Sequence, residues 1–281
     1  MILIADSGST KTSWCLLKNG DATLFFETEG YNPYFADTDY IADSLLRELP
    51  ADVDRHSVAR VYFYGAGCFE DKKGIVSAAL AIVFPGASSA VALDLLASAR
   101  ALLGDAPGFV AILGTGANTC LYDGSHIIAN IDSLGYLLGD EGSGFYLGRK
   151  LLGDYIRGYM PEPVQDEFME RYGVTREEIM ERVYTAPMPN RFCASFAAFL
   201  TESVAGGEYT RGLVKEGLRD FFDNLVSRYP DYTRYSFNCV GSVGYAFREL
   251  LTEMAVGYGM RVGNILRSPI DGLVVYHAAE R

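Results

Sequence analysis

The sequence is short of the residue types on which most metal sites and nucleophilic triads depend. It contains 3 histidines and 5 cysteines in 281 residues, and no two cysteines stand in a C-x-x-C arrangement. So few histidines argue against a histidine-based metal site or a Ser-His-Asp triad. Five scattered cysteines predict neither a disulfide framework nor a zinc site. Free thiols of this kind are typical of a reducing compartment, so we expect the protein to be cytoplasmic.

Positive charge is also in deficit. Lys and Arg number 24 against 36 Asp and Glu, which gives a net charge of −12. A general nucleic-acid binder needs a basic face, so we expect no nucleic-acid partner and no docking on anionic lipid. No run reaches the roughly 18 apolar residues of a membrane span, and the N-terminus meets Asp6 without a basic region, unlike a signal peptide. A small anion is still allowed, because backbone N–H groups and a metal ion can hold it.

Strands and helices alternate along the chain, which predicts an α/β protein with mixed sheets. A boundary signal rich in glycine falls at 104–108, and a strand, a glycine-hydroxyl turn and a hairpin occur on both sides of it, at about 2–27 and 109–131. We therefore expect one domain at 1–106 and a second at 107–267 with a helical insertion, and a C-terminal helix at about 268–281 that packs back on the first. The strands are predicted at 1–6, 12–17, 22–27, 58–65, 89–93, 109–113, 119–122, 126–131, 235–240 and 259–265, and the helices at 38–49, 73–83, 95–103, 144–159, 163–171, 175–183, 190–204, 211–228, from 241 onward and at 270–279.

The first candidate site is the turn after the first strand. Asp6 ends that strand, and the turn supplies successive N–H groups that can surround phosphate oxygens. Asp6 can hold Mg²⁺, which takes only one or two carboxylates, and Lys11 can add charge to a phosphate. A polar hairpin turn is the alternative, and the P-loop pattern is absent. The turn residues are Ser7, Gly8, Ser9, Thr10 and Lys11.

Two further glycine turns are candidates for the same ligand. Gly114, Thr115 and Gly116 form a second glycine-hydroxyl turn between strands, and Gly241 with Ser242 stands where a strand meets a helix. The first turn suits phosphate and the second allows a backbone to approach an adenosine. A plain hairpin and a plain strand–helix turn are the alternatives.

Carboxylates mark two other positions. Asp94 lies between a strand and a helix, where it can cap the helix or accept a proton from a substrate hydroxyl. Asp140 stands in a stretch with glycines at 135, 139, 142 and 144, before a helix. A rigid carboxylate beside glycines suits a sugar, because it accepts from neighbouring hydroxyls while glycine lets the ring approach. An acidic helix N-terminus is the alternative for Asp140.

Taken in this order, the motifs resemble the actin-like ATPase superfamily, and within it the N-acetylglucosamine kinase branch of the BadF/BadG/BcrA/BcrD ATPases. The likeness spans nearly the whole chain. It implies two actin-like (ribonuclease H-like) α/β domains with mixed sheets flanked by helices, and nucleotide and sugar in the interdomain cleft. A homodimer is a family-level expectation.

The resemblance also implies roles for single residues. Asp6 resembles the Mg²⁺-associated carboxylate, and Asp94 the catalytic base at the substrate hydroxyl. Asn32, Gly135 and Asp140 resemble sugar-binding residues. Ser7, Gly8, Ser9, Thr10, Lys11, Gly114, Thr115, Gly116, Gly241 and Ser242 resemble contacts of ATP.

The expected function is an ATP- and Mg²⁺-dependent amino-sugar kinase that phosphorylates N-acetylglucosamine at its 6-hydroxyl. Leu134 stands where animal members have a tryptophan, so glucosamine, N-acetylmuramic acid or another hexose derivative stays open as the substrate. A non-kinase ATPase that drives a partner protein is the alternative within the family, and a sugar-responsive protein without catalysis is a third hypothesis.

Overall fold

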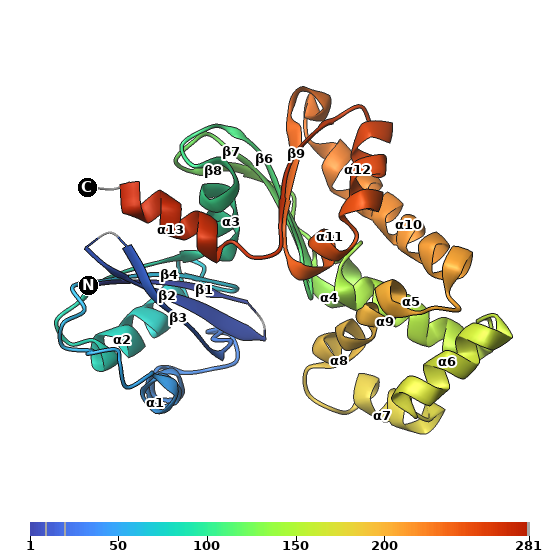
Figure 1. Ribbon diagram of the computed structural model, residues 1–281, viewed down its shortest axis with the longest axis horizontal. Helices are drawn as coiled ribbons and strands as arrows, with labels where there is room; N and C mark the ends of the chain where they lie inside the picture. The colour runs from blue at the N-terminus through green and yellow to red at the C-terminus, as the bar shows by residue number, and fades with distance from the viewer. Residues whose placement is uncertain (9, 20, 280–281) are drawn as a thin grey trace. The chain divides into compact units, whose positions relative to one another are not determined.

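The computed structural model describes residues 1–8, 10–19 and 21–279, which fall into two compact units. The first unit comprises Met1–Pro107, Asp123–Ile127 and the segment from Ser268 on. The second comprises Gly108–Tyr122 and Ile128–Arg267. Each unit is built on a sheet of five strands, and Figure 1 labels the elements of both.

The sheet of the first unit has the strand order β3-β2-β1-β4-β5. The first three strands are antiparallel neighbours, whereas β4 and β5 run parallel to β1. The strands are β1 (Ile2–Ser7), β2 (Lys11–Lys18), β3 (Asp21–Glu29), β4 (Arg60–Gly65) and β5 (Ser88–Leu93). The helices are α1 (Thr38–Glu48), α2 (Lys73–Val83), α3 (Asp94–Leu103) and α13 (Ile270–Ala279).

Helices cover both faces of this sheet because successive side chains of a strand point to opposite faces. On β1, Leu3 and Ala5 pack into the core under α1 and α2, and Ile4 packs into the core that α3 and α13 complete. The continuous apolar run at the start of the sequence therefore folds as a strand buried on both sides.

The sheet of the second unit has the order β10-β9-β6-β7-β8, with β7 antiparallel and β9 parallel to β6. Both sheets thus combine an antiparallel hairpin with parallel crossovers. The strands are β6 (Gly108–Leu113), β7 (Ala117–Tyr122), β8 (Ile127–Asn130), β9 (Ser236–Val240) and β10 (Arg261–Leu266).

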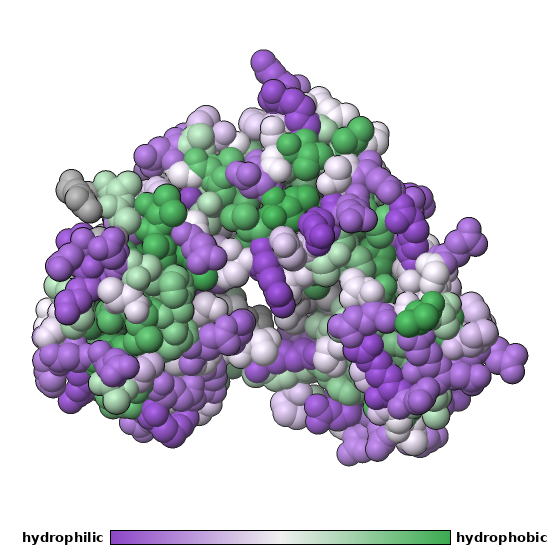
Figure 2. All heavy atoms as spheres, viewed as in Figure 1, coloured by the Kyte–Doolittle hydropathy of each residue, from purple (hydrophilic) through white to green (hydrophobic). Residues whose placement is uncertain are grey.

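Most of the second unit is helical, and hydrophilic side chains gather over α6 and α7 on the face seen in Figure 2. The helices before β9 are α4 (Gly135–Leu138), α5 (Gly144–Arg157), α6 (Glu162–Tyr172), α7 (Arg176–Tyr184), α8 (Pro189–Ser195), η1 (Phe196–Ala198), α9 (Phe199–Glu202), α10 (Gly207–Asn224), η2 (Val226–Arg228) and η3 (Tyr232–Arg234). Between β9 and β10 lie α11 (Ser242–Ala246) and α12 (Arg248–Gly257).

Two predicted helices are wrong in their continuity. The helix expected at 190–204 is divided among α8, the single 3₁₀ turn η1 and α9. The helix expected after Gly241 breaks at Phe247, whose ψ of 23° leaves the α-helical range. Buried aromatic packing explains the first break, since Phe196 in η1 stacks on Phe168 of α6 with ring centroids 5.7 Å apart.

All five cysteines are buried and free. Burial raises the pKa of the Cys239 thiol to about 12 and that of Cys193 to about 11. Within the residues that the structure describes, no helix is long and apolar enough to cross a membrane.

Candidate functional site

In the first unit, the predicted residues lie at the carboxyl edge of the parallel strands. Asp6 is near the end of β1, and Asp94 follows β5 directly as the first residue of α3. Strand β4 lies between β1 and β5, and the turn that follows β4 holds Gly67. Parallel strands deliver their C-terminal ends to one edge of a sheet, which is where ligands bind in open α/β sheets. The fold therefore brings Asp6 and Asp94 to the same edge of the first sheet.

The pKa values of both carboxyl groups, Asp6 and Asp94, are raised toward neutral pH. Burial raises the pKa of Asp6 to about 7, the charge of Asp94 adds to the rise, and Lys11 opposes it. Burial raises the pKa of Asp94 to about 6, against hydrogen bonds from the backbone N–H groups of Leu95 and of Asp94 itself. Carboxylates with pKa values close to the working pH are suited to proton transfer or to binding a cation.

Asp94 is not the N-cap of α3. Leu93 holds that position with extended backbone angles, and no side chain caps the helix there. The capping alternative for Asp94 is therefore not supported by the structure. The residue as a whole is half-buried at the strand edge.

Asn32 lies beside Gly67 in the loop after β3. Its amide oxygen accepts a hydrogen bond from the Tyr34 N–H at 3.0 Å, which leaves the amide N–H groups as donors for a ligand. A Cβ on Gly67 would lie 2.5 Å from the Asn32 Oδ1, and the φ of Gly67 is +78°. Gly67 thus allows Asn32 its position, a role that the sequence analysis missed. The signal was the Gly-Ala-Gly run that begins at Gly65, the last residue of β4.

The Ser7 hydroxyl is used inside the protein. It is fully buried, lies 2.7 Å from the Thr12 hydroxyl and accepts the Tyr31 N–H at 3.0 Å. The Tyr31 N–H is one residue from Asn32, so Ser7 connects the end of β1 to the segment that carries Asn32.

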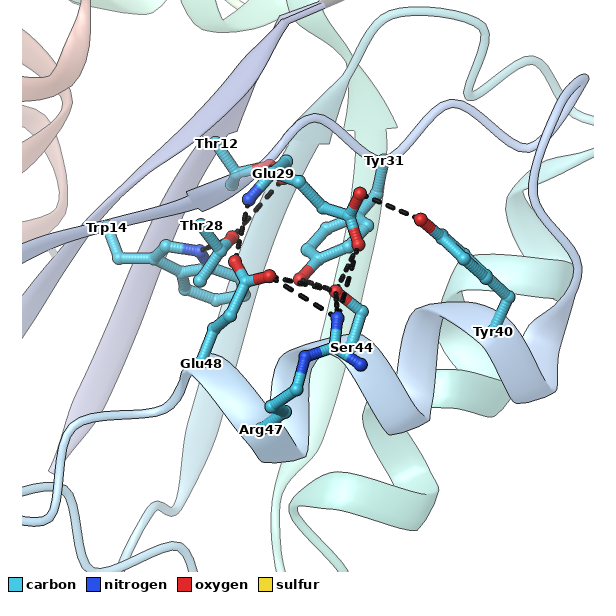
Figure 3. A network of polar contacts seen from close by, with 9 residues as sticks. All are labelled: Thr12, Trp14, Thr28, Glu29, Tyr31, Tyr40, Ser44, Arg47 and Glu48. Atoms are coloured by element: carbon cyan, nitrogen blue, oxygen red, sulfur yellow. Dashed lines mark hydrogen bonds and ion pairs between the residues drawn. The ribbon is translucent and has the colours of Figure 1, made fainter.

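A polar network on α1 holds the same segment from the other side (Figure 3). The Ser44 hydroxyl contacts the Glu29 carboxylate and lies 3.3 Å from both the Tyr31 hydroxyl and Glu48 Oε1. Glu48 also accepts the backbone N–H of Glu29 at 2.9 Å, and the Tyr40 hydroxyl donates to Glu29 at 2.8 Å. Helix α1 therefore fixes the end of β3 just before the Asn32 loop.

The remaining residues of the first turn have varied surroundings. The Gly8 N–H donates to the Lys11 carbonyl at 2.9 Å, which closes the turn, and the Thr10 carbonyl accepts from the Gly30 N–H at 3.2 Å. The Lys11 ammonium pairs with the Glu27 carboxylate, and both side chains are exposed. Ser9 lies outside the described residues.

Replacing Ser7 with alanine is expected to raise the KM of a substrate that binds at Asn32 and to lower thermal stability. The substitution leaves the Tyr31 N–H without its partner, which costs about 1 to 3 kcal/mol, while the Thr12 hydroxyl keeps its hydrogen bond to the Glu29 carbonyl at 2.8 Å. Steady-state kinetics and thermal unfolding measure the two effects. Ser57→Ala, at an exposed hydroxyl that contacts Asp54, is the control. An unchanged KM for Ser7→Ala would show that Ser7 does not position the Asn32 loop.

The contribution of Asp6 and Asp94 to the free energy of unfolding is expected to fall as the pH rises. An ion-paired carboxylate with a lowered pKa would behave in the opposite way. The folded pKa values of Asp6 and Asp94, about 7 and about 6, lie above their usual value of 3.8. Their contribution to the free energy of unfolding is fully present below pH 3.8 and is lost as the pH rises through 6 to 7. In metal-free buffer, Asp6→Asn should therefore unfold at a higher temperature than the unmodified protein at pH 8, with the difference shrinking toward pH 4. Equal differences at both pH values would refute the raised pKa of Asp6.

In the second unit, the Gly114–Gly116 turn lies on the N-terminus of α5. The N–H groups of Gly144 and Phe145 donate to the carbonyls of Gly114 at 2.8 Å and Thr115 at 3.0 Å. The strand–helix turn at Gly241 reaches the same place, because a Cβ on Gly241 would lie 3.2 Å from the Gly114 N atom. The structure thus brings two of the predicted glycine turns together.

Close packing explains why glycine stands at both position 241 and position 244. Gly241 has a φ of +129°, and its Cβ would lie 2.3 Å from the Leu113 carbonyl oxygen. A Cβ on Gly244 would lie 2.7 Å from the Cys239 Sγ. Both glycines let the turn approach the end of β6. Ser242 is exposed at the first position of α11.

Asp140 supports the second-unit turn directly. Its carboxylate accepts the Ala117 N–H at 3.0 Å and contacts Ser133, while burial raises its pKa. A Cβ on Gly116 would lie 3.0 Å from the Asp140 Oδ2, so the absence of a side chain at Gly116 leaves room for this carboxylate. Asp140 is buried, at 8% exposed.

Two non-glycine residues with left-handed backbones flank α4. Leu134 has a φ of 61° and Asp140 a φ of 57°, and Gly135 between them is exposed with a φ of 65°. Such conformations cost energy for residues with a side chain and cluster at functional sites. Leu134, Leu137 and Leu138 are exposed around this short helix, a feature that the sequence analysis did not anticipate.

The single carboxylate of Asp6 fits a magnesium ion whose other ligands are water and phosphate oxygens. Within the described part of the chain, no group of three or more His, Cys, Asp and Glu residues gathers. Mg²⁺ needs only one or two protein carboxylates when water and phosphate oxygens supply the rest. A cation beside Asp6 would also offset the repulsion from Asp94 that raises its pKa.

No family model and no curated protein matches the sequence. Among solved structures, a Porphyromonas gingivalis protein described as a "Putative N-acetylglucosamine Kinase" is 43% identical, with 99% of each chain covered and a TM-score of 0.94. A Chromobacterium violaceum protein of the same description is 20% identical over 98% of both chains, with a TM-score of 0.73.

A more distant likeness extends the fold comparison. A Streptomyces griseus ROK family glucokinase, solved with glucose and AMPPNP, is 14% identical and has a TM-score of 0.55, with 99% of this chain and 98% of that chain covered. These two likenesses below 25% identity support the fold, two mixed sheets flanked by helices. At 43% identity over 99% of each chain, the chain belongs to the family of the Porphyromonas gingivalis protein, a family of sugar kinases.

Proposed function

We propose that the protein transfers the γ-phosphoryl group of ATP to the 6-hydroxyl of N-acetylglucosamine. The observation that carries this proposal is the 43% identity, over 99% of both chains, to the Porphyromonas gingivalis protein described as a "Putative N-acetylglucosamine Kinase". The motifs that resemble the N-acetylglucosamine kinase branch of the BadF/BadG/BcrA/BcrD ATPases point to the same substrate.

Asp94 is the proposed general base. It accepts the proton of the sugar hydroxyl as the hydroxyl oxygen bonds to the γ-phosphorus and the bond to the ADP oxygen breaks. Its pKa of about 6 leaves it mostly ionised at neutral pH and still basic enough to accept the proton. The Asn32 amide and the Asp140 carboxylate are the proposed contacts that orient the sugar.

Asp6 is the proposed carboxylate for Mg²⁺, which would supply positive charge to the phosphates when bound. The backbone N–H groups of the two turns other than those of Gly8 and Gly114, which donate within their own turns, are the proposed phosphate donors, together with the Thr10 and Thr115 hydroxyls. Ser242 and Gly241 are proposed at the adenosine.

A panel assay tests the proposal. Transfer of phosphate from ATP is measured with N-acetylglucosamine, glucosamine, N-acetylmannosamine, N-acetylmuramic acid and glucose, and the position of the product phosphate is read by ³¹P–¹H NMR. The highest kcat/KM with N-acetylglucosamine and a 6-phosphate product support the proposal. If another sugar has the highest kcat/KM, that sugar replaces N-acetylglucosamine as the proposed substrate. If no sugar stimulates ATP turnover, the proposed kinase activity is wrong and a non-kinase ATPase is favoured.

A further inference from the structure

A long groove on the second unit contains none of the predicted site residues. It has a volume of about 1210 Å³ and is lined by one side of α5, by α7 and α10, and by Cys193 of α8. These helices belong to the helical insertion, where Figure 1 shows α7 and α8 close to α5.

Basic side chains are concentrated in this groove although the chain as a whole has a net charge of −12. Arg149, Lys150, Arg157 and Arg176 all line it. Only Lys150 pairs with a carboxylate, that of Glu216 at 2.8 Å. Across the described residues, the guanidinium groups of Arg149, Arg157 and Arg176 form no ion pair within 4.0 Å. Three carboxylates line the groove as well, and Arg149 stacks 5.1 Å from the centroid of the Tyr146 ring. The three guanidinium groups that form no ion pair are nevertheless available to an anionic ligand.

Two helix-interior glycines line the same groove and have no packing reason of their own. A Cβ on Gly212 of α10 would meet nothing within 4 Å, and one on Gly153 of α5 would meet only Arg157 Nη1 at 3.4 Å. Each helix also has a glycine that packing does require. A Cβ on Gly148 would lie 1.9 Å from the Cys193 carbonyl oxygen, and one on Gly217 would lie 2.6 Å from Leu147 Cδ2.

Glycine is among the least favourable residues in a helix interior, so an open position filled by glycine loses helix stability without gaining protein contacts. Gly153 lies one turn from both Arg149 and Arg157 on the same side of α5, since residues four apart are neighbours on a helix. The absence of its side chain leaves space between the two guanidinium groups.

The other lining groups suit a sugar. Tyr159 and Tyr184 are 68% and 75% exposed, and flat aromatic faces can pack against a ring. Asp154, Glu208 and Glu216 line the groove as hydrogen-bond acceptors, and Asp154 also accepts from the Tyr209 hydroxyl at 2.9 Å. Guanidinium groups match phosphate in bidentate geometry, and carboxylates match hydroxyls.

We propose that this groove is a second ligand site, which binds a phosphorylated sugar through Arg149, Arg157 and Arg176. The inference goes beyond the proposed function, and only the choice of N-acetylglucosamine 6-phosphate as one probe rests on it. A sugar monophosphate and a nucleotide sugar share the required chemistry, so both serve as probes.

The test measures binding to the full chain by isothermal titration calorimetry. The probes are N-acetylglucosamine 6-phosphate, UDP-N-acetylglucosamine, glucose 6-phosphate and inorganic phosphate. We expect at least one sugar phosphate to bind at a site that the double variant Arg157→Gln/Arg176→Gln weakens by about tenfold or more, because hydrogen bonds between charged groups are among the strongest. Sugar-kinase activity measured without added sugar phosphate should be unchanged in this variant.

Two further variants separate this result from a folding defect. Arg182→Gln, on the same helix α7 and stacked 5.2 Å over Phe192 outside the groove, should bind sugar phosphates as the unmodified protein does. Gly212→Leu should fill the groove and weaken binding while the helix is retained. Gly257→Ala, at a helical glycine that also has nothing within 4 Å but lies outside the groove, is its control.

Three outcomes would overturn the proposal. They are sugar-phosphate affinity unchanged in Arg157→Gln/Arg176→Gln, an equal loss in Arg182→Gln, and inorganic phosphate binding as tightly as every sugar phosphate. Failure of the proposed kinase substrate is distinguishable, because the panel assay would then fail while glucose 6-phosphate or the nucleotide sugar still bound in the groove.

Discussion

Asp94→Asn is expected to lower kcat by about 10² to 10⁴-fold, the usual contribution of a positioned general base. Asparagine keeps the size of the side chain and its place at the end of β5, but it cannot accept the proton of the sugar hydroxyl. Binding of ATP and the thermal stability of the protein should be retained. Steady-state kinetics with N-acetylglucosamine and a nucleotide-binding titration measure the two properties.

The pH dependence of the unmodified protein checks the same assignment. Because burial raises the pKa of Asp94 to about 6 and that of Asp6 to about 7, kcat/KM should rise as the pH increases through 6 to 7 and then level off. A carboxylate with an ordinary pKa would place that rise near 4 instead.

Asp271→Asn is the matched control for Asp94→Asn, since Asp271 is the acidic residue in the first turn of α13 as Asp94 is in α3. If Asp94 only stabilised the start of its helix, both variants would lose a little stability and neither would lose activity. Full activity in Asp94→Asn would remove the base assignment.

Asp6→Asn is expected to lower kcat/KM by about two orders of magnitude or more at low millimolar Mg²⁺. This is the size expected when an electrostatic contribution to phosphoryl transfer is removed. Asparagine removes the charge that would hold the ion and stabilise it beside the phosphates. Part of the loss should be recovered at high Mg²⁺, which shows as a raised Mg²⁺ concentration for half-maximal rate.

The same substitution should stabilise the metal-free protein at pH 8, because it removes a carboxylate whose burial and whose repulsion from Asp94 are unfavourable. Gain of stability with loss of activity is the pattern of a residue kept for function. Asp21→Asn, at an exposed carboxylate at the start of β3, should change neither property. An unaltered Mg²⁺ dependence in Asp6→Asn would exclude Asp6 as the metal carboxylate.

The bounds of two helices were predicted closely from the sequence. The helix predicted at 73–83 is α2 over the same residues, and the helix at 270–279 is α13. Periodicity failed at 190–204 and after Gly241. Apolar positions three and four apart suit an α-helix and a 3₁₀ turn equally over so few residues, so the breaks at η1 and Phe247 depend on tertiary packing.

The candidate site was predictable as far as strand ends determine it. Asp6 and Asp94 follow strands in the sequence, and the parallel order of β1, β4 and β5 brings those ends to one edge. The use of the Ser7 hydroxyl to hold Tyr31 depends on a contact between residues 24 positions apart, which no local pattern contains. The left-handed backbone of Asp140 was equally hidden, because glycines, not Asp140, carried the turn signal.

The return of α13 to the first unit has a consequence for how the chain is made. Ile270 and Leu273 complete the core over one face of the first sheet, and His277 is buried, stacked 3.8 Å from the Tyr62 ring and 2.9 Å from the Tyr64 hydroxyl. Domains generally form as soon as their residues leave the ribosome. Here the first unit must wait, with that face of its sheet covered by α3 but not by α13, until the whole second unit has been translated. A nascent chain stalled before Ile270 should therefore expose apolar surface to chaperones, although all five strands of its first sheet have been synthesised.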